Sequence, residues 1–149
     1  MINDKLINPS GIVVVGGSED LLKPGGKILK NIIDGKFPGD LFVVNPKQDV
    51  VQGVKSYRDI RDIPPVDLAI IAVPSRFCYD IVNVLVKEKG TSAFIIISAG
   101  FSEAGEEGRK LEKAIADLIE NSGGCLIGPN CIGVVTKIYH GVFTTTEPK

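Results

Sequence analysis

The sequence has no tryptophan, a single histidine and only three cysteines, and these scarcities exclude several kinds of site. One histidine, His140, cannot supply a histidine–cysteine zinc cluster. Cys78, Cys125 and Cys131 are odd in number and form no C-x-x-C pair, which indicates reduced thiols rather than a disulfide framework. We therefore expect neither a metal site nor structural disulfides.

Long apolar runs and an excess of basic charge are absent as well. The longest apolar runs extend over only a few residues, too short to cross a bilayer, and residues 1–10 contain no apolar signal sequence. The formal net charge is -1 at pH 7 and no basic stripe is evident, which argues against a nucleic-acid surface. We expect a cytoplasmic protein that binds neither membranes nor nucleic acids.

The sequence does contain enough apolar residues for one core, because 44% of its 149 residues are hydrophobic and they recur along the whole chain. Apolar segments alternate with helical patterns. The expected strands are residues 12–15, 41–44, 68–73, 94–97 and 126–127, and the expected helices are residues 25–36, 75–89 and 105–121. Strands that are apolar on both faces and separated by amphipathic helices indicate a parallel sheet covered on both sides. We predict a single α/β domain over residues 1–149 with a doubly wound, Rossmann-like parallel sheet.

Within this framework the sequence also predicts particular side-chain positions. Residues 45–67 are predicted to form a turn-rich connection, and Ser75 is the expected N-cap of the helix that follows the third strand. Cys78 and Cys125 are expected to behave as small buried hydrophobes. The side chains expected on the inner faces of the second and third helices are Phe77, Ile81, Val84, Leu85, Leu111, Ile115, Leu118 and Ile119.

Ligands of doubly wound sheets bind beyond the carboxyl ends of the strands. In this sequence the segments at those ends are dominated by Gly, Pro, Ser and Asn, which suggests backbone amides exposed to a ligand with phosphates. Turn geometry alone would favour the same residue types, and this alternative applies to each segment. The segments are residues 16–18, 45–47, 73–75, 98–100 and 128–131.

The first of these loops departs from the G-x-G-x-x-G fingerprint of NAD-binding domains. Ser18 stands in place of the second glycine, and Leu21 in place of the third. The fingerprint also has an acid at the end of the second strand for the ribose hydroxyls, and here that strand end is Asn45-Pro46-Lys47. The pattern disfavours NAD, leaves NADP as an alternative and favours coenzyme A, whose pyrophosphate and 3′-phosphate suit a Gly/Ser loop with a lysine. The alternative for Lys47 is a solvated turn residue, and Pro24 is expected to open the next helix.

Three segments taken together carry a family resemblance: VDLAIIAVPSRFCYDIV, FIIISAGFSEAGEEG and LIGPNCIGVVT. In this order they resemble the CoA-binding domain of nucleoside-diphosphate-forming acyl-CoA synthetases, a group that includes ADP-forming acetyl-CoA synthetase and the alpha subunit of succinyl-CoA synthetase. The segments KPGGKILKNI and FVVNPK look more like the acetyl-CoA synthetase branch. The resemblance covers about residues 12–143.

The resemblance implies that coenzyme A lies across the strand ends. It implies that the phosphates lie near Gly16, Gly17 and Ser18, and that Lys47, preceded by Pro46, supplies positive charge. It also implies that Val73, Pro74 and Ser75 border the nucleotide end of the groove, with Ser98 and Ala99 close by. Asn130 and Cys131 match the family's PNC turn, which lies towards the CoA thiol; a simple tight turn is the structural alternative. No basic partner is evident for Cys131, so we expect no nucleophilic role for it.

Enzymes of this family form an acyl phosphate, pass the phosphoryl group to a histidine and transfer the acyl group to CoA. The phosphohistidine and the ATP-grasp nucleotide site belong to other domains. KIYHGVF around His140 does not resemble the phosphohistidine motif, so we expect a surface histidine there. The chain is accordingly expected to be the N-terminal fragment of a longer synthetase, inactive alone and partnered by downstream ligase and ATP-grasp domains or a subunit.

Two other classes of function stay open at this point. One is a stand-alone or regulatory CoA-binding module without catalysis, and the other is an NAD(P)-binding sensor domain, which the loop and the missing acid disfavour. No catalytic residue is assigned. The acid that is activated, the choice between ADP and GDP, and the formation of a homo-oligomer are not determined by the sequence.

Overall fold

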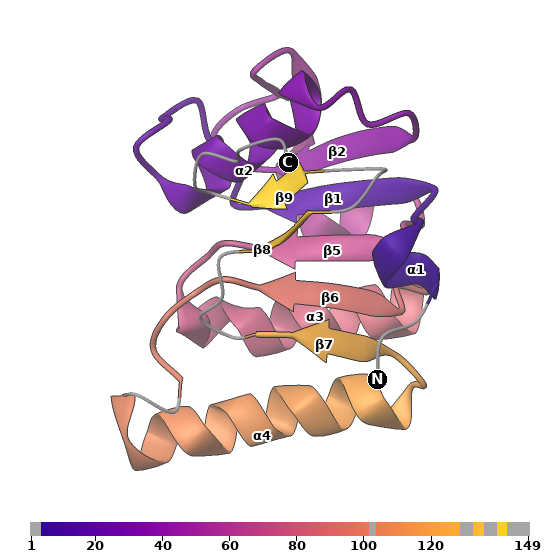
Figure 1. Ribbon diagram of the computed structural model, residues 1–149. Coiled ribbons are helices and arrows are strands. Elements are labelled where there is room, and N and C mark those ends of the chain that lie inside the picture. Colours follow the sequence, from indigo (N-terminus) through magenta and orange to yellow (C-terminus); the bar gives the residue numbers. More distant parts are fainter. Residues whose placement is uncertain (1–3, 102–103, 129–132, 136–139, 143–149) are drawn as a thin grey trace.

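A computed structural model describes residues 4–101, 104–128, 133–135 and 140–142 (Figure 1). One sheet contains the strands β1 (Gly11–Val15), β2 (Asp40–Val44), β3 (Val50–Val51), β4 (Val54–Tyr57), β5 (Leu68–Ile71), β6 (Ala93–Ile96) and β7 (Cys125–Ile127). The helices are α1 (Asp4–Ile7), α2 (Pro24–Asp34), α3 (Ser75–Glu88) and α4 (Glu106–Asn121), with a short 3-10 turn η1 (Ile60–Asp62). The strands β8 (Gly133–Val135) and β9 (His140–Val142) form a separate antiparallel pair.

The order of the strands in the sheet is β3-β4-β2-β1-β5-β6-β7. The pairs along β4-β2-β1-β5-β6-β7 are all parallel, and β3 alone pairs antiparallel, with β4. The direction in which strands are added reverses between β1 and β5, where Val15 stands in register with Ile71. This order confirms the predicted doubly wound fold, and it places the switch point, where such sheets bind ligands, at the ends of β1 and β5.

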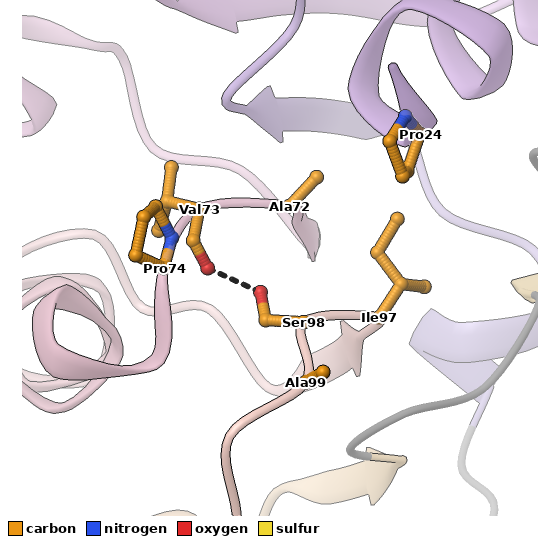
Figure 2. A pocket seen from close by; sticks show the side chains of 7 residues that line it. All are labelled: Pro24, Ala72, Val73, Pro74, Ile97, Ser98 and Ala99. Atoms are coloured by element: carbon orange, nitrogen blue, oxygen red, sulfur yellow. Dashed lines mark hydrogen bonds between the residues drawn. The ribbon is translucent and has the colours of Figure 1, made fainter. Parts of the chain in front are cut away.

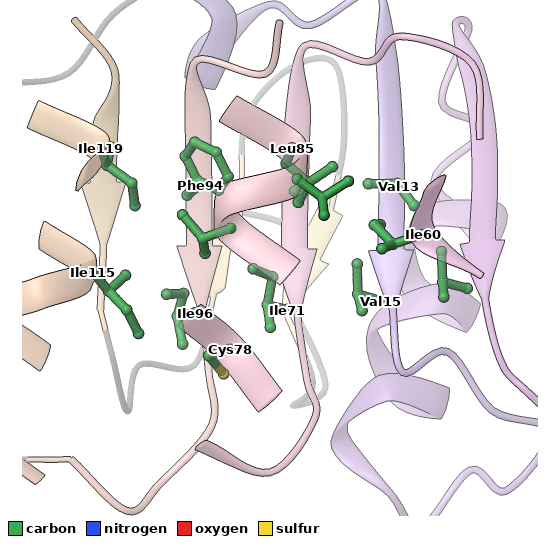
Figure 3. Packing of buried hydrophobic residues seen from close by; sticks show 14 of the residues in the cluster. Val13, Val15, Ile60, Ile71, Cys78, Leu85, Phe94, Ile96, Ile115 and Ile119 are labelled. Atoms are coloured by element: carbon green, nitrogen blue, oxygen red, sulfur yellow. The ribbon is translucent and has the colours of Figure 1, made fainter. Parts of the chain in front are cut away.

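Helices cover both faces of the sheet, and alternate strand residues point to opposite faces (Figure 1). Val13 and Val15 of β1 belong to the cluster formed with α3 and α4, whereas Ile12 and Val14 belong to the cluster formed with α1 and α2. Figure 3 shows the first cluster, in which side chains of the central strands point toward Leu85 of α3. Because both faces of β1 are buried, its five residues are all apolar or glycine, as a parallel strand requires.

The predicted helices and main strands are confirmed with small shifts of their ends, but the prediction for residues 45–67 was incomplete. This stretch contains the hairpin of β3 and β4, which closes one edge of the sheet, and the turn η1. The short helix α1 was not predicted either. It is held by the buried side chain of Leu6, by an ion pair between Lys5 and Asp67, and by a hydrogen bond from the Ser10 backbone N–H to the Asp67 carboxylate.

The predicted inner face of α3 was wrong at one position. Phe77 is 48% exposed, and the guanidinium of Arg76 lies 4.6 Å from the centroid of its ring. Cys78 is fully buried instead, because α3 begins directly after Pro74 and its buried stripe therefore runs through residues 78, 82 and 85. Ser75 is the first residue of this helix and not its N-cap, which is Pro74.

The predicted inner face of α4 is confirmed. Ile115 and Ile119 are buried, and Leu111 and Leu118 pack against the same cluster. Within the part of the chain that the structure describes, no helix has both the length and the apolar character needed to cross a membrane.

Candidate functional site

The loop after β1 lies where three strand ends converge. The backbone N–H of Gly16 donates to the carbonyl of Val44 at 3.0 Å, and the N–H of Ala72 donates to the carbonyl of Val15 at 2.8 Å. Gly16 has a φ of +91°, and a Cβ on it would stand 2.7 Å from the carbonyl oxygen of Ala72. Only glycine fits this position, because both the backbone angle and the space exclude a side chain.

The first turn of α2 packs directly on this loop. A Cβ on Gly25 would stand 2.1 Å from the carbonyl oxygen of Gly16, and a Cβ on Gly26 would stand 2.1 Å from the carbonyl oxygen of Asp20. Pro24 opens the helix, as predicted, and no side chain caps it. The first N–H groups of a helix lack partners within the helix, so this end of α2 offers donors and a positive dipole to an anion.

Asn45 connects the end of β2 to the same loop. Its side-chain Nδ2 donates to the carbonyl of Gly17 at 3.1 Å, and its Oδ1 accepts from the backbone N–H of Lys47 at 2.9 Å. Lys47 is exposed, next to exposed Pro46. At the strand end where an NAD-binding domain has its acid, the amide of Asn45 is therefore bonded to the protein backbone. The charged side chain at this strand end is Lys47.

Gln52 reaches the loop from the turn between β3 and β4. Its side-chain Nε2 donates to the carbonyl oxygens of Ser18, at 2.7 Å, and Gly26, at 2.9 Å. Its backbone N–H donates to the carboxylate of Glu19 at 2.8 Å. One side chain thus joins the loop, the start of α2 and the edge of the sheet.

A pocket of about 300 Å³ lies beside the loop, between the ends of β5 and β6 and the start of α2 (Figure 2). The hydroxyl of Ser98 donates to the carbonyl of Val73 across the pocket, which joins the two strand ends. The lining is mostly apolar, and it consists of Pro24, Ala72, Val73, Pro74, Ile97, Ser98 and Ala99.

The structure brings most of the predicted site residues to one edge of the sheet, although not all into the pocket. Val73, Pro74, Ser98 and Ala99 line it together. Residues 16–18 form the neighbouring loop, and residues 46–47 lie at the end of β2, tied to that loop through Asn45. Ser75 does not line the pocket; it lies beside Gly100, on which a Cβ would stand 2.6 Å from the Ser75 Oγ. Asn130 and Cys131 lie outside the described residues.

Cys78 lies behind the pocket wall. Its Sγ is within hydrogen-bonding distance of the carbonyl oxygens of Val73, at 3.8 Å, and Pro74, at 3.7 Å. Burial raises the pKa of Cys78 to about 11, although a hydrogen bond with Ser98 acts in the opposite direction. The thiol is therefore protonated at neutral pH and is not a nucleophile. Cys125 is also buried, so the prediction of two small buried hydrophobes is confirmed.

Gln52, Pro24, Ala72 and Ile97 were not among the predicted site residues. Gly53, between two valine-containing segments, indicates a turn next to Gln52, but the carbonyls that the Gln52 side chain reaches leave no signal in the sequence. The three pocket residues could not be identified in this way, because each belongs to a strand end or helix start whose neighbours come from elsewhere in the chain.

Comparison with known proteins agrees with this geometry. Residues 10–137 match the family model described as CoA binding domain. The chain belongs to this family. The CoA-binding domain is 42% identical over 135 residues to the acetate–CoA ligase (ADP-forming) II subunit alpha of Pyrococcus furiosus, which covers 89% of this chain and 29% of that protein. It is 33% identical over 154 residues to the 4-hydroxybutyrate–CoA ligase (ADP-forming) of Nitrosopumilus maritimus, covering 100% of this chain and 22% of that one.

Solved structures give the same result. The CoA-binding domain superposes on PH0766 from Pyrococcus horikoshii with a TM-score of 0.88 and 42% identity, over 98% of this chain and 34% of that chain. It superposes on the acetyl-coenzyme A synthetase 1 of Candidatus Korarchaeum cryptofilum, solved with phosphate and ADP, with a TM-score of 0.87 and 32% identity, over 95% of this chain and 31% of that chain. The domain thus spans about a third or less of the length of these relatives.

These findings confirm the predicted resemblance to the nucleoside-diphosphate-forming acyl-CoA synthetases and the prediction that the domain binds coenzyme A. The residues present also fit this ligand. A glycine loop packed closely on an uncapped helix start offers backbone N–H donors, which suit a phosphate group. The mostly apolar pocket beside it suits an uncharged part of the same molecule.

Proposed function

We propose that this domain holds coenzyme A for a nucleoside-diphosphate-forming acyl-CoA synthetase. The carrying observation is that the glycine loop at Gly16, packed on the uncapped start of α2, and the mostly apolar pocket lie next to each other at the switch point of the sheet. A ligand with a pyrophosphate joined to an apolar group matches both surfaces at once.

In this proposal the phosphates of CoA lie near Gly16, Gly17 and Ser18. The Oγ of Ser18 accepts from the Asp20 N–H at 3.0 Å, so its hydroxyl proton is available to donate to a phosphate oxygen. Lys47 adds positive charge at the adjacent strand end, following Pro46.

The nucleotide end of CoA lies against the pocket. Val73 and Pro74 line one side of it and Ser98 and Ala99 the other, while Ser75 lies just beyond. Asn130 and Cys131, outside the described residues, are proposed to lie toward the CoA thiol.

Catalysis in this proposal needs partners. The steps through an acyl phosphate and a phosphohistidine take place on ligase and ATP-grasp domains or a subunit, and this chain alone is inactive. The support is that the relatives are ligases, or alpha subunits of ligases, several times longer than the region they share with this chain. The whole assembly acts in the cytoplasm, in keeping with its unpaired buried thiols Cys78 and Cys125.

The proposal is tested by calorimetric titration of the 149-residue chain with CoA, dephospho-CoA and NADH. We expect CoA to bind more tightly than dephospho-CoA, and NADH to bind most weakly. No binding of CoA at millimolar concentration to the folded chain, or equal binding of NADH, would contradict the proposal. Sequencing the gene beyond the codon for Lys149 separates a synthetase from a stand-alone CoA-binding module, since only the synthetase reads on into a phosphohistidine domain.

A further inference from the structure

Two side-chain amides, from Asn45 and Gln52, donate hydrogen bonds to consecutive carbonyl groups of the loop after β1. Asn45 Nδ2 donates to the Gly17 carbonyl at 3.1 Å, and Gln52 Nε2 donates to the Ser18 carbonyl at 2.7 Å. Both amides are oriented by their partners. Each nitrogen faces a carbonyl oxygen, which can only accept, and the Oδ1 of Asn45 faces an N–H of Lys47, which can only donate.

Fixing these carbonyls also fixes the N–H groups that follow them. In a trans peptide the C=O of one residue and the N–H of the next point in opposite directions. The Ser18 N–H therefore points away from the Asn45 amide, and the Glu19 N–H points away from the Gln52 amide. Among the residues that the structure describes, neither N–H takes part in a hydrogen bond. Successive backbone N–H groups without protein acceptors are the donors from which anion-binding nests are built.

We propose that Asn45 and Gln52 are positioning residues that orient the Ser18 and Glu19 N–H groups toward the phosphates of coenzyme A. This inference rests on the proposed placement of CoA. It means that two residues outside the pocket hold the loop after β1 in its binding conformation before CoA binds. Gln52 contributes more than Asn45, because its second bond, to the Gly26 carbonyl at 2.9 Å, also fixes the loop against the start of α2.

The charge of the two amides suits this role. A lysine or arginine would hold the same carbonyls but would also attract the phosphates to itself, whereas a carboxylate could not donate to a carbonyl at all. A neutral amide donates to the backbone and leaves the attraction of the anion to the N–H groups and to Lys47. Because the loop is already ordered, it loses little conformational freedom when CoA binds, and this smaller entropy cost raises the affinity for CoA.

The test compares CoA binding by the 149-residue chain and by its Gln52→Met variant, which keeps the side-chain length but has no donor. We expect about tenfold weaker binding, the scale of one or two lost hydrogen bonds. In ¹⁵N nuclear magnetic resonance spectra, we expect the Ser18 and Glu19 amide signals to move on addition of CoA to the wild type and to move much less in the variant. A residue with a structural role only would change the melting temperature and leave these signals responsive.

Three further variants complete the experiment. Gln52→Asn suits the left-handed backbone of the turn but is too short to reach both carbonyls, so it is expected to keep the fold and weaken CoA binding about as much as Gln52→Met. Gln52→Glu is compared with Gln48→Glu, which adds the same charge at a nearby exposed turn position that makes no bond to the loop. Gln52→Glu is expected to bind CoA at least tenfold more weakly than Gln48→Glu.

The outcomes separate this inference from the proposed function. CoA binding that is unchanged within twofold in both Gln52→Met and Gln52→Asn would overturn the positioning role and leave the proposed function intact. Equal weakening by Gln52→Glu and Gln48→Glu would also overturn it, because charge alone would then explain the loss. Failure of the wild-type chain to bind CoA would overturn the proposed function and this inference together.

Discussion

The α-carbon of Gly25 lies against the carbonyl oxygen of Gly16, so closely that a methyl group on Gly25 would stand 2.1 Å from that oxygen. The contact is between two backbones, and neither side has a flexible side chain that can move away. The loop after β1 and the first turn of α2 are therefore one packed unit.

The Gly25→Ala substitution is expected to disrupt this unit. Alanine is the better helix former by about 1 kcal/mol, but overpacking against a fixed backbone costs about 3 kcal/mol, so the free energy of unfolding should fall by about 2 kcal/mol. CoA binding should weaken as the loop is displaced. Urea unfolding and calorimetric titration measure the two effects. Gly11→Ala is the control, since its Cβ would meet nothing closer than 3.7 Å; equal stability of the two variants would show that the contact is not rigid.

Lys47 provides a second test of the site. Reversal of its charge in Lys47→Glu places a carboxylate near the proposed position of the CoA phosphates, and we expect CoA binding to weaken about tenfold at low salt, with a smaller loss for NADH. Binding at several salt concentrations measures this effect. Lys110→Glu, which makes the same change on the exposed face of α4, is the control. Equal losses for CoA and NADH would contradict a specific role for Lys47.

The raised pKa of Cys78 predicts that the free energy of unfolding decreases at alkaline pH. Burial raises the pKa of Cys78 in the folded protein from 9.0 to about 11, so the folded state keeps a proton that the unfolded chain releases. The contribution of this thiol to stability is complete below a pH of about 8.5 and is lost as pH rises toward the folded pKa, by at most about 1.4 kcal/mol per pH unit. Unfolding curves of the wild type and Cys78→Ala between neutral and alkaline pH measure this difference. Parallel pH profiles for the two proteins would refute the assignment.

Two buried hydroxyls in different environments give a matched pair of substitutions. Ser56 is buried in β4, and its Oγ has no hydrogen-bond partner among the described residues, whereas the Thr91 Oγ1 donates to the Val66 carbonyl at 2.9 Å. Ser56→Ala removes an unsatisfied polar atom and is expected to raise the free energy of unfolding by about 1 kcal/mol. Thr91→Val leaves a carbonyl without its donor and is expected to lower it by about 1 kcal/mol. Urea unfolding that gives both changes the same sign would contradict this interpretation.

The sequence was sufficient to predict the fold class and the edge of the sheet that forms the site, because both depend on local patterns. Apolar runs such as residues 12–15 and 94–97 are buried on both faces, and the glycine-rich and proline-rich segments that follow them lie together at the carboxyl ends of the strands. The departure from the NAD fingerprint at Ser18 and Lys47 was likewise visible in the sequence alone.

Features that depend on contacts between distant residues could not be predicted. The exposure of Phe77 follows from where Pro74 directs the start of α3, a rotation that apolar periodicity does not determine when neighbouring residues are both hydrophobic. The two carbonyl groups that Gln52 binds lie 34 and 26 residues away in the chain. Backbone carbonyls are present in every residue, so no sequence pattern marks which ones a side chain will reach.

The turn at Gln52 has a consequence for the engineering of this domain. Gln52 has a φ of +49° and Gly53 a φ of +79°, a backbone in which Asn-Gly is the preferred pair. A search for thermostable variants by turn statistics alone would replace Gln52 with asparagine. The same replacement would release the carbonyls of Ser18 and Gly26 from their donor. At this position the residue that turn statistics prefer is therefore expected to weaken CoA binding and to loosen the loop from the sheet edge, so the turn and the loop favour different residues.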